Sequence, residues 1–249
     1  MSLDRPPGKR AYERGLHELG PGLYAYLQPD GSWGWSNAGL ITDGGQAVLV
    51  DTLFDLGLTG TMLQTMRDAV PAAARFEALV NTHANGDHWF GNQLVPTSRI
   101  IATQRCAEEM LEQSPDGMAA MMAAAPGLGA TGAFLRHIFG RFQFGGIVPT
   151  LPTESFEVEL TLQIGDLEVR VRDLGPAHTS SDSIVYVPDA RTVFTGDLLF
   201  IGGHPIMWSG PSENWIAALD TILGLDVDHI VPGHGPLTDK EGVRELRRY

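Results

Sequence analysis

The sequence has one cysteine, few basic residues and no long apolar run. Because Cys106 is the only cysteine, no disulfide can form within the chain, and an oxidising compartment is not required. No stretch approaches the roughly 20 apolar residues that cross a membrane, and the first residues, MSLDRPPGKRAYERG, lack the apolar segment of a signal peptide. We therefore expect a cytoplasmic protein without a membrane partner.

Positive charge is scarce: 17 Lys and Arg stand against 30 Asp and Glu, a formal net charge of −13 over 249 residues. Nucleic acids are disfavoured as partners, because that affinity depends mainly on Lys and Arg that neutralise phosphates. Hydrophobic residues make up 43% of the chain and charged residues 19%, which favours a folded chain over a disordered one. No linker is visible, so we expect one domain over residues 1–249.

The first third of the chain predicts a strand meander followed by a helix and a strand. Three apolar runs, 22–28, 35–42 and 47–52, are separated by Gly-containing turn signals and predict consecutive antiparallel strands. Apolar residues at helical spacing predict a helix over 56–70, and a short strand is expected over 76–81.

Residues 104–144 are rich in Ala, Met and Gly and predict two or three helical pieces broken at Pro115, Pro126 and Gly140. We interpret this segment as a helical insertion in the domain. Its Met and aromatic residues favour core or interface packing, with a mobile lid over a site as the alternative. Cys106 lies in this segment, where we expect it to pack as a small apolar side chain.

The second half of the chain returns to strands. They are expected over 156–160, 162–164, 167–173, 183–187, 192–195 and 228–231, with a helix over 214–223 before the last one. Two strand-rich halves, each with helices, predict an α/β fold in the form of a four-layer αββα sandwich.

The most unusual segment is NTHANGDHWFGN, which begins at Asn81 directly after an expected strand. It places His83, Asn85, Asp87 and His88 within six residues. Alternate residues of an extended loop face one side, and Gly86 allows the backbone to turn and bring His88 around. Imidazole nitrogens and carboxylate oxygens are ligands of zinc, so the segment predicts part of a metal site.

Three later segments set one His or Asp beside Gly or Pro after a strand-like run. They are GPAHTSSD with His178, TGDLLF with Asp197, and PGHG with His234. A ligand on a tight loop at the end of a rigid strand suits a metal site assembled from distant parts of the chain.

In the order HxNxDH, PAHT, TGDLLF and PGHG, these segments resemble the metallo-β-lactamase superfamily, whose first motif normally reads HxHxDH. The resemblance extends from Asp51 to Gly235. It implies a two-metal site. The implied ligands are His83, position 85 and His178 at the first ion, Asp87, His88 and His234 at the second, and Asp197 bridging both.

Position 85 departs from the family pattern, because Asn85 replaces the second His of the motif. An amide oxygen is a harder and weaker zinc donor than imidazole. We predict one tightly bound Zn²⁺ and a second that is weak or absent. Alternatively, Asn85 ligates through its oxygen or holds a water molecule and both ions bind.

Other residues near the motifs receive smaller roles. Asp51 is expected to orient a ligand His rather than to bind metal. His204, in GGHPIMW, follows the Asp197 segment and joins Asp87 and Asp197 as a candidate catalytic residue. Six apolar side chains cluster around the motif loops, and we expect most of them to pack the core and some to form a wall for a flat apolar substrate. These are Trp35, Trp89, Phe90, Met207, Trp208 and Trp215.

The resemblance implies an enzyme in which metal-activated water hydrolyses an ester, lactone, amide or thioester of a small molecule, with Asp87 or Asp197 orienting the nucleophile. NTHANGDHWFGNQL, GPAHTSSD and TGDLLFIGGHPIMW are also similar to the polyketide ring cyclases of this fold, which implies aldol closure as an alternative. A non-catalytic binding module is the alternative from another class. Homo-oligomerisation and the substrate itself stay open.

Overall fold

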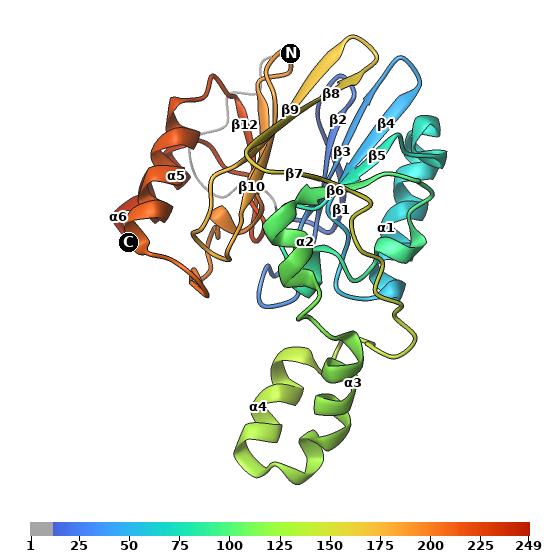
Figure 1. Cartoon of the computed structure of the whole chain (residues 1–249), viewed down its shortest axis with the longest axis vertical. Helices are drawn as coiled ribbons and strands as arrows, with labels where there is room; N and C mark the ends of the chain where they lie inside the picture. Colours follow the sequence, from blue (N-terminus) through green and yellow to red (C-terminus); the bar gives the residue numbers. More distant parts are fainter. Residues whose placement is uncertain (1–11) are drawn as a thin grey trace.

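Two β-sheets face each other in the computed structural model, which describes residues 12–249 (Figure 1). The first sheet follows the chain order and is antiparallel from β1 to β4 and parallel from β4 to β7. Its strands are Gly15–Gly20 (β1), Leu23–Leu27 (β2), Ala38–Asp43 (β3), Gln46–Val50 (β4), Ala78–Val80 (β5), Ile100–Thr103 (β6) and Glu154–Phe156 (β7). The polar residues 1–11, part of the segment that lacks a signal-peptide pattern, lie outside the described residues.

The second sheet has the order β12-β11-β10-β9-β8. Its strands are Glu159–Ile164 (β8), Leu167–Asp173 (β9), Ser183–Val187 (β10), Thr192–Phe194 (β11) and His229–Val231 (β12). Neighbours pair antiparallel except β11 with β12, which pair parallel. The carboxyl ends of β11 and β12 therefore lie at one edge of this sheet, as those of β4 and β5 do in the first.

Helices cover the outer face of each sheet, and the layers follow from strand alternation. Val48 and Val50 of β4 point into the core between the sheets, whereas Leu49 packs on the other side with α1 (Leu56–Ala69). On the opposite flank, α5 (Ser212–Gly224) packs with the second sheet and α6 (Lys240–Arg248) (Figure 1). Three apolar clusters thus separate four layers, and the αββα sandwich is confirmed.

The helix α1 forms because its start and its buried face are both encoded locally. The carboxylate of Asp55 accepts a hydrogen bond from the Leu58 N–H at 2.7 Å, which caps the helix. Met62 and Met66, four residues apart, are fully buried against the first sheet. The helix ends at Ala69, before Pro71.

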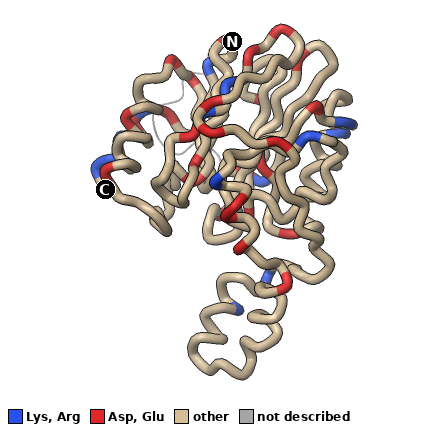
Figure 2. Tube along the Cα trace, viewed as in Figure 1, with Lys and Arg blue, Asp and Glu red and all other residues tan. Residues whose placement is uncertain are grey.

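Three helices occupy the chain between β6 and β7. They are α2 (Gln104–Met110), α3 (Pro115–Ala124) and α4 (Gly129–Phe139), with Pro115 at the start of α3 and Gly140 just after α4. α3 and α4 form a lobe that projects from the body (Figure 1), and few charged residues lie on this lobe (Figure 2). Cys106 of α2 is buried, as expected for a packing residue.

Several elements differ from the sequence-based predictions. The runs 156–160 and 162–164 are wrong as two strands: β7 and the single strand β8 occupy this region. The sequence analysis missed β1, β6 and α6. β6 has four residues, too few for a periodic pattern, and α6 is mostly charged, with Val243 as its fully buried residue. Within the described part of the chain, no helix is long and apolar enough to cross a membrane.

Candidate metal centre

The four motif loops meet at one end of the sandwich. Residues 81–88 follow β5, and His178 lies in the loop between β9 and β10. Asp197 lies in the 3-10 turn after β11, and His234 follows β12. Parallel pairing places the carboxyl ends of β4 and β5 side by side in the first sheet and those of β11 and β12 side by side in the second.

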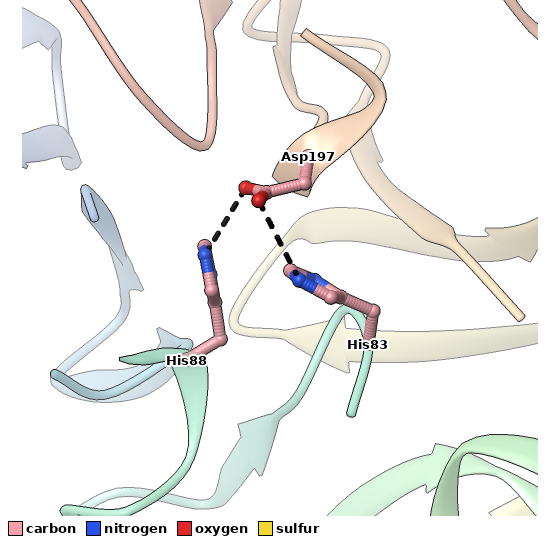
Figure 3. Close-up of side chains that lie close together, drawn as sticks. All are labelled: His83, His88 and Asp197. Atoms are coloured by element: carbon pink, nitrogen blue, oxygen red, sulfur yellow. Dashed lines mark ion pairs between the residues drawn. The ribbon is translucent and has the colours of Figure 1, made fainter. Parts of the chain in front are cut away.

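The carboxylate of Asp197 lies among four histidine rings. Its Oδ1 is 3.1 Å from Nε2 of His88, and its Oδ2 is 3.7 Å from Nε2 of His83 (Figure 3). The same Oδ2 lies 3.3 Å from Nε2 of His178 and 3.4 Å from Nε2 of His234. All five side chains are buried, although they come from segments up to 151 residues apart, from position 83 to position 234.

Two groups of these side chains could hold a metal ion. One comprises His83, His88 and Asp197, and the other comprises Asp87, His88 and His234. The second group is the ligand set that the resemblance implies for the second ion. His88 belongs to both groups, whereas the family pattern assigns it to the second ion alone.

The buried polar atoms of the centre fit a cation. Nε2 of His83, Nε2 of His88 and Oδ1 of Asp197 face the centre and are buried without a hydrogen-bond partner among the described residues. A buried polar atom that lacks a partner costs about 1–3 kcal/mol, so several of them in one cluster point to a ligand. Imidazole nitrogens and carboxylate oxygens are the donors that zinc and similar divalent ions take.

Burial and neighbouring charges shift the pKa values of the clustered histidines in opposite directions. Burial lowers the pKa of His83 well below its usual range, assisted by the charge of His88. Burial opposes protonation of His88 and His234 as well, but the nearby carboxylates outweigh it: Asp197 and Asp87 raise the pKa of His88 well above its usual range and that of His234 to about 9. A cation that binds here therefore competes with protons for these rings.

Asp51 orients His88 from behind. Its Oδ2 lies 2.9 Å from Nδ1 of His88, while its two oxygens accept hydrogen bonds from the backbone N–H and the hydroxyl of Thr82, each at 2.8 Å. Asp51 has a φ of 61°, an unusual conformation for a residue other than glycine. This arrangement holds Nδ1 as the donor and turns Nε2 toward Asp197.

His178 is fixed by two contacts that the sequence did not reveal. Its Nδ1 donates to the carbonyl oxygen of Ile206 at 2.6 Å, which leaves Nε2 facing the centre. The buried carboxylate of Asp182 accepts hydrogen bonds from the N–H groups of Ala177 and Thr179 and from the Thr179 hydroxyl. Asp182 stands four residues after His178 in GPAHTSSD, and this spacing was the available signal for a loop-shaping residue.

Asn85 is partly buried and points toward His178. Its Nδ2 lies 3.1 Å from Nε2 of His178. A half-turn of the amide would present Oδ1 of Asn85 to the same point. Asn85 therefore lies where the family pattern places a histidine, and its role as a ligand stays a prediction.

Hydrogen bonds from Asn37 and a close backbone contact at Gly233 fix the loop that carries His234. Nδ2 of Asn37 donates to the carbonyl oxygens of Pro232 and Gly235, at 2.9 and 2.8 Å. A Cβ on Gly233 would lie 2.0 Å from Oδ1 of Asp197, so this position accepts only glycine without displacement. The close backbone approach sets the position of the Asp197 carboxylate.

A cavity of about 650 Å³ opens onto Asp87, His178, Asp197 and His234. Aromatic side chains form its wall: the Trp33 ring lies 6.2 Å from that of Phe139 and 6.4 Å from that of Trp208, centroid to centroid. Trp33 and Phe139 were missed by the sequence analysis, because they come from a loop and from α4 and carry no motif. Phe139 and Met118 give the 104–144 segment a share of the wall.

The aromatic residues expected near the site divide into two groups. Trp89, Phe90 and Trp215 are buried, and the indole N–H groups of Trp89 and Trp215 donate to backbone carbonyls. Trp35 packs at 4.9 Å from the Phe142 ring. Trp208 is exposed and lines the cavity, whereas Met207 is exposed and lines a separate cavity near α5 and α6.

His204 lies at the rim, apart from the histidine cluster. It lines the same cavity, and its Nε2 is 2.9 Å from the hydroxyl of Tyr249. It is exposed and makes no contact with Asp87 or Asp197 among the interactions of the described residues. A catalytic role for His204 therefore stays a prediction.

Comparison with known proteins now defines the class. The model of the metallo-beta-lactamase superfamily matches residues 31–234, and the chain belongs to this superfamily. Solved metallo-beta-lactamases share the fold. The enzyme from Pontibacter korlensis superposes with a TM-score of 0.66 at 17% identity, covering 95% of this chain and 98% of that one. The DIM-1 metallo-beta-lactamase gives 0.65 at 17% identity, covering 96% and 97%.

Two curated relatives match in part. A hydroxyacylglutathione hydrolase from Dictyostelium discoideum is 35% identical over 95 residues, 35% of this chain and 33% of that protein. The alpha subunit of a 2,4-dinitroanisole O-demethylase from Nocardioides sp. (strain JS1661) is 25% identical over 194 residues, 75% of this chain and 48% of that protein. The chain thus spans between a third and a half of these relatives. The family and the geometry of the site together support metal binding by this chain.

Proposed function

We propose that the protein is a zinc-dependent hydrolase of a small molecule that carries an ester, lactone, amide or thioester. The observation that supports this most strongly is the Asp197 carboxylate among four buried histidines, two of which turn toward it a ring nitrogen without a hydrogen-bond partner in the described residues. An apolar cavity that opens directly onto this cluster gives a substrate access to it.

The chain's own residues divide the work. Asp87, His88 and His234, together with Asp197, would hold one ion tightly, and His83, Asn85 and His178, with the same Asp197, would hold a second ion more weakly because Asn85 is a poor zinc donor. When bound, a divalent cation supplies Lewis acidity that polarises a carbonyl and acidifies water.

Asp87 and Asp197 handle the proton. Asp87 lines the cavity, and its Oδ2 lies 3.3 Å from Nε2 of His234. A carboxylate at this place orients an attacking water molecule and accepts its proton, and it then delivers that proton to the leaving group. The aromatic wall of Trp33, Phe139 and Trp208 binds the apolar body of the substrate.

The first test is a substrate panel with the metal-loaded protein. It contains a nitrophenyl ester, an aryl lactone, an aryl thioester and, because one relative is named for O-demethylation of 2,4-dinitroanisole, an aryl methyl ether. We expect turnover of at least one member, loss of turnover with a chelator, and its return with added zinc. Turnover that survives complete metal removal contradicts the proposal.

The aromatic wall also favours a second candidate, a metal-dependent ring cyclase of the polyketide type. In that reaction the same cavity folds a flat poly-carbonyl chain for aldol closure and dehydration. A cyclase leaves the whole hydrolysis panel untouched and converts a poly-β-ketone thioester analogue to a ring, which mass spectrometry detects as loss of water. A metal-free protein that is inactive in both assays indicates a non-catalytic binding module.

A further inference from the structure

The charge of the cavity wall carries information about its ligand. The described residues that line the cavity include three carboxylates, those of Asp87, Glu109 and Asp197, and no Lys or Arg. Asp87 and Asp197 belong to the candidate metal centre, where a bound divalent cation would offset their two charges. Glu109 lies outside the centre, so its charge stays uncompensated in the wall.

Ser180, in the loop that carries His178, holds the Glu109 carboxylate in place. Its Oε2 accepts hydrogen bonds from the backbone N–H of Ser180, at 3.3 Å, and from the Ser180 hydroxyl. Ser180 is two residues from His178, so this contact ties α2 to the loop that presents His178 to the centre. The contact fixes the Glu109 carboxylate beside the cavity rather than leaving it in bulk solvent.

The other oxygen of Glu109 is free for a ligand. Among residues 12–249, Oε1 of Glu109 has no hydrogen-bond partner, and no Lys, Arg or His forms an ion pair with this carboxylate. Glu109 is half-buried, a setting in which the surrounding water screens a charge less than at an open surface. An anionic group brought close to Glu109 meets repulsion, and no Lys or Arg lines the cavity to offset it.

We propose that Glu109 determines substrate charge: the cavity takes aromatic substrates whose distal group is uncharged or a protonated amine, and it rejects substrates with a distal carboxylate. This inference rests on the proposed function, because it specifies the substrate class of the same site. The aromatic wall binds the flat body, the metal centre faces the scissile bond, and Oε1 of Glu109 accepts a hydrogen bond from the distal amine or hydroxyl.

A binding experiment isolates the charge effect. The probes are 2-naphthylmethylamine, 2-naphthylmethanol and 2-naphthoate, which share one ring system and differ in the charge of the attached group. Each is titrated calorimetrically into the metal-loaded wild-type protein, the Glu109→Gln variant and the Glu112→Gln variant. Glu112 is an exposed carboxylate three residues away that does not line the cavity, so its variant matches the change in net charge.

The expected result is a change in affinity that depends on the probe. Glu109→Gln lowers the affinity for the ammonium probe by about tenfold, leaves the affinity for the alcohol within about twofold, and raises the affinity for the carboxylate by severalfold. Glu112→Gln changes none of these affinities. The affinity of each probe is compared between the wild-type protein and the variants. Any direct contact between the naphthoate carboxylate and the metal is present in all three proteins and cancels in this comparison. Equal shifts for all three probes, no shift, or no measurable binding of the ammonium probe to the wild-type protein overturns the inference.

A parallel assay separates this inference from the proposed function. Nitrophenyl esters that carry a distal amine, hydroxyl or carboxylate are offered to the same three proteins. Hydrolysis without charge discrimination overturns the inference and leaves the hydrolase proposal intact. No turnover of these esters or of any member of the substrate panel, with the probe-dependent binding still present, contradicts the hydrolase proposal alone.

Discussion

Oδ2 of Asp51 lies 2.9 Å from Nδ1 of His88, on the side of the ring opposite to the nitrogen that faces Asp197. Asp51 thus reaches the metal centre without being part of it, since Thr82 and His88 use both of its oxygens. Partners of this kind fix the tautomer and raise the basicity of a ligand histidine.

The Asp51→Asn variant tests this role. Its amide can present an N–H to Nδ1 of His88, which favours the wrong tautomer, and we expect metal affinity to fall about 10- to 100-fold. Competition with a fluorescent zinc chelator measures the affinity. Asp43→Asn is the control, because Asp43 accepts a hydrogen bond from Asp166 at a distant hairpin. Equal affinities of the Asp51→Asn variant and the wild type contradict the role.

Gly233 tests the close approach of the backbone to Asp197. In Gly233→Ala the new Cβ lies 2.0 Å from Oδ1 of Asp197 and 2.6 Å from the carbonyl carbon of Gly196, so one of these groups must shift. We expect weaker metal binding and a turnover at least tenfold lower, since catalytic groups tolerate little displacement. In Gly224→Ala, the control, the Cβ meets no heavy atom within 4 Å. Similar metal affinity and turnover in the two variants would refute the packing argument.

The buried carboxylate of Asp182 is expected to stabilise the loop of His178. Asp182→Ala removes the acceptor of the Ala177 and Thr179 N–H groups and of the Thr179 hydroxyl, and it leaves these donors buried. We expect the free energy of unfolding to fall by about 3 kcal/mol, measured by urea denaturation. Asp189→Ala, at an exposed turn, is expected to stay within about 0.5 kcal/mol of the wild type. A similarly small effect at Asp182 shows that the loop holds without it.

The aromatic wall predicts a preference for aryl substrates. Trp33→Ala removes the ring that packs with both Phe139 and Trp208, and we expect KM for an aryl ester to rise about tenfold. The kcat/KM for a small aliphatic ester of the same alcohol should change little. Met207→Ala serves as the control, because Met207 is similarly exposed and lines the other cavity. An equal loss for aryl and aliphatic esters indicates that Trp33 supports the fold rather than the substrate.

The family fold could be predicted because its signals are local. The run at 47–52, the helical pattern of 56–70 and the polar loop after Asn81 each appear within a few residues, and the structure has β4, α1 and the loop after β5 there. β6 could not be predicted, because a four-residue strand is defined by its parallel neighbours β5 and β7 rather than by its own pattern.

In the candidate site, too, some residues have a local sequence signal and others are brought in by tertiary packing alone. The histidines and aspartates of the four motifs could be named from the sequence, since each lies beside Gly or Pro on a loop. The carbonyl of Ile206, the Trp33–Phe139 contact and the Ser180–Glu109 contact could not. These contacts join residues 28 to 106 positions apart with no distinctive pattern in the sequence, and tertiary packing alone brings them together.

The measurement that tests the central claim most directly is the zinc content of the purified protein, determined by elemental mass spectrometry after dialysis, together with that of the Asn85→His variant. The account predicts about one tightly held zinc per chain in the wild type, rising toward two in the variant, because imidazole replaces a weak amide donor beside His178. Zinc absent from both proteins, even after incubation with the metal, would contradict the account and leave a binding module in place of an enzyme.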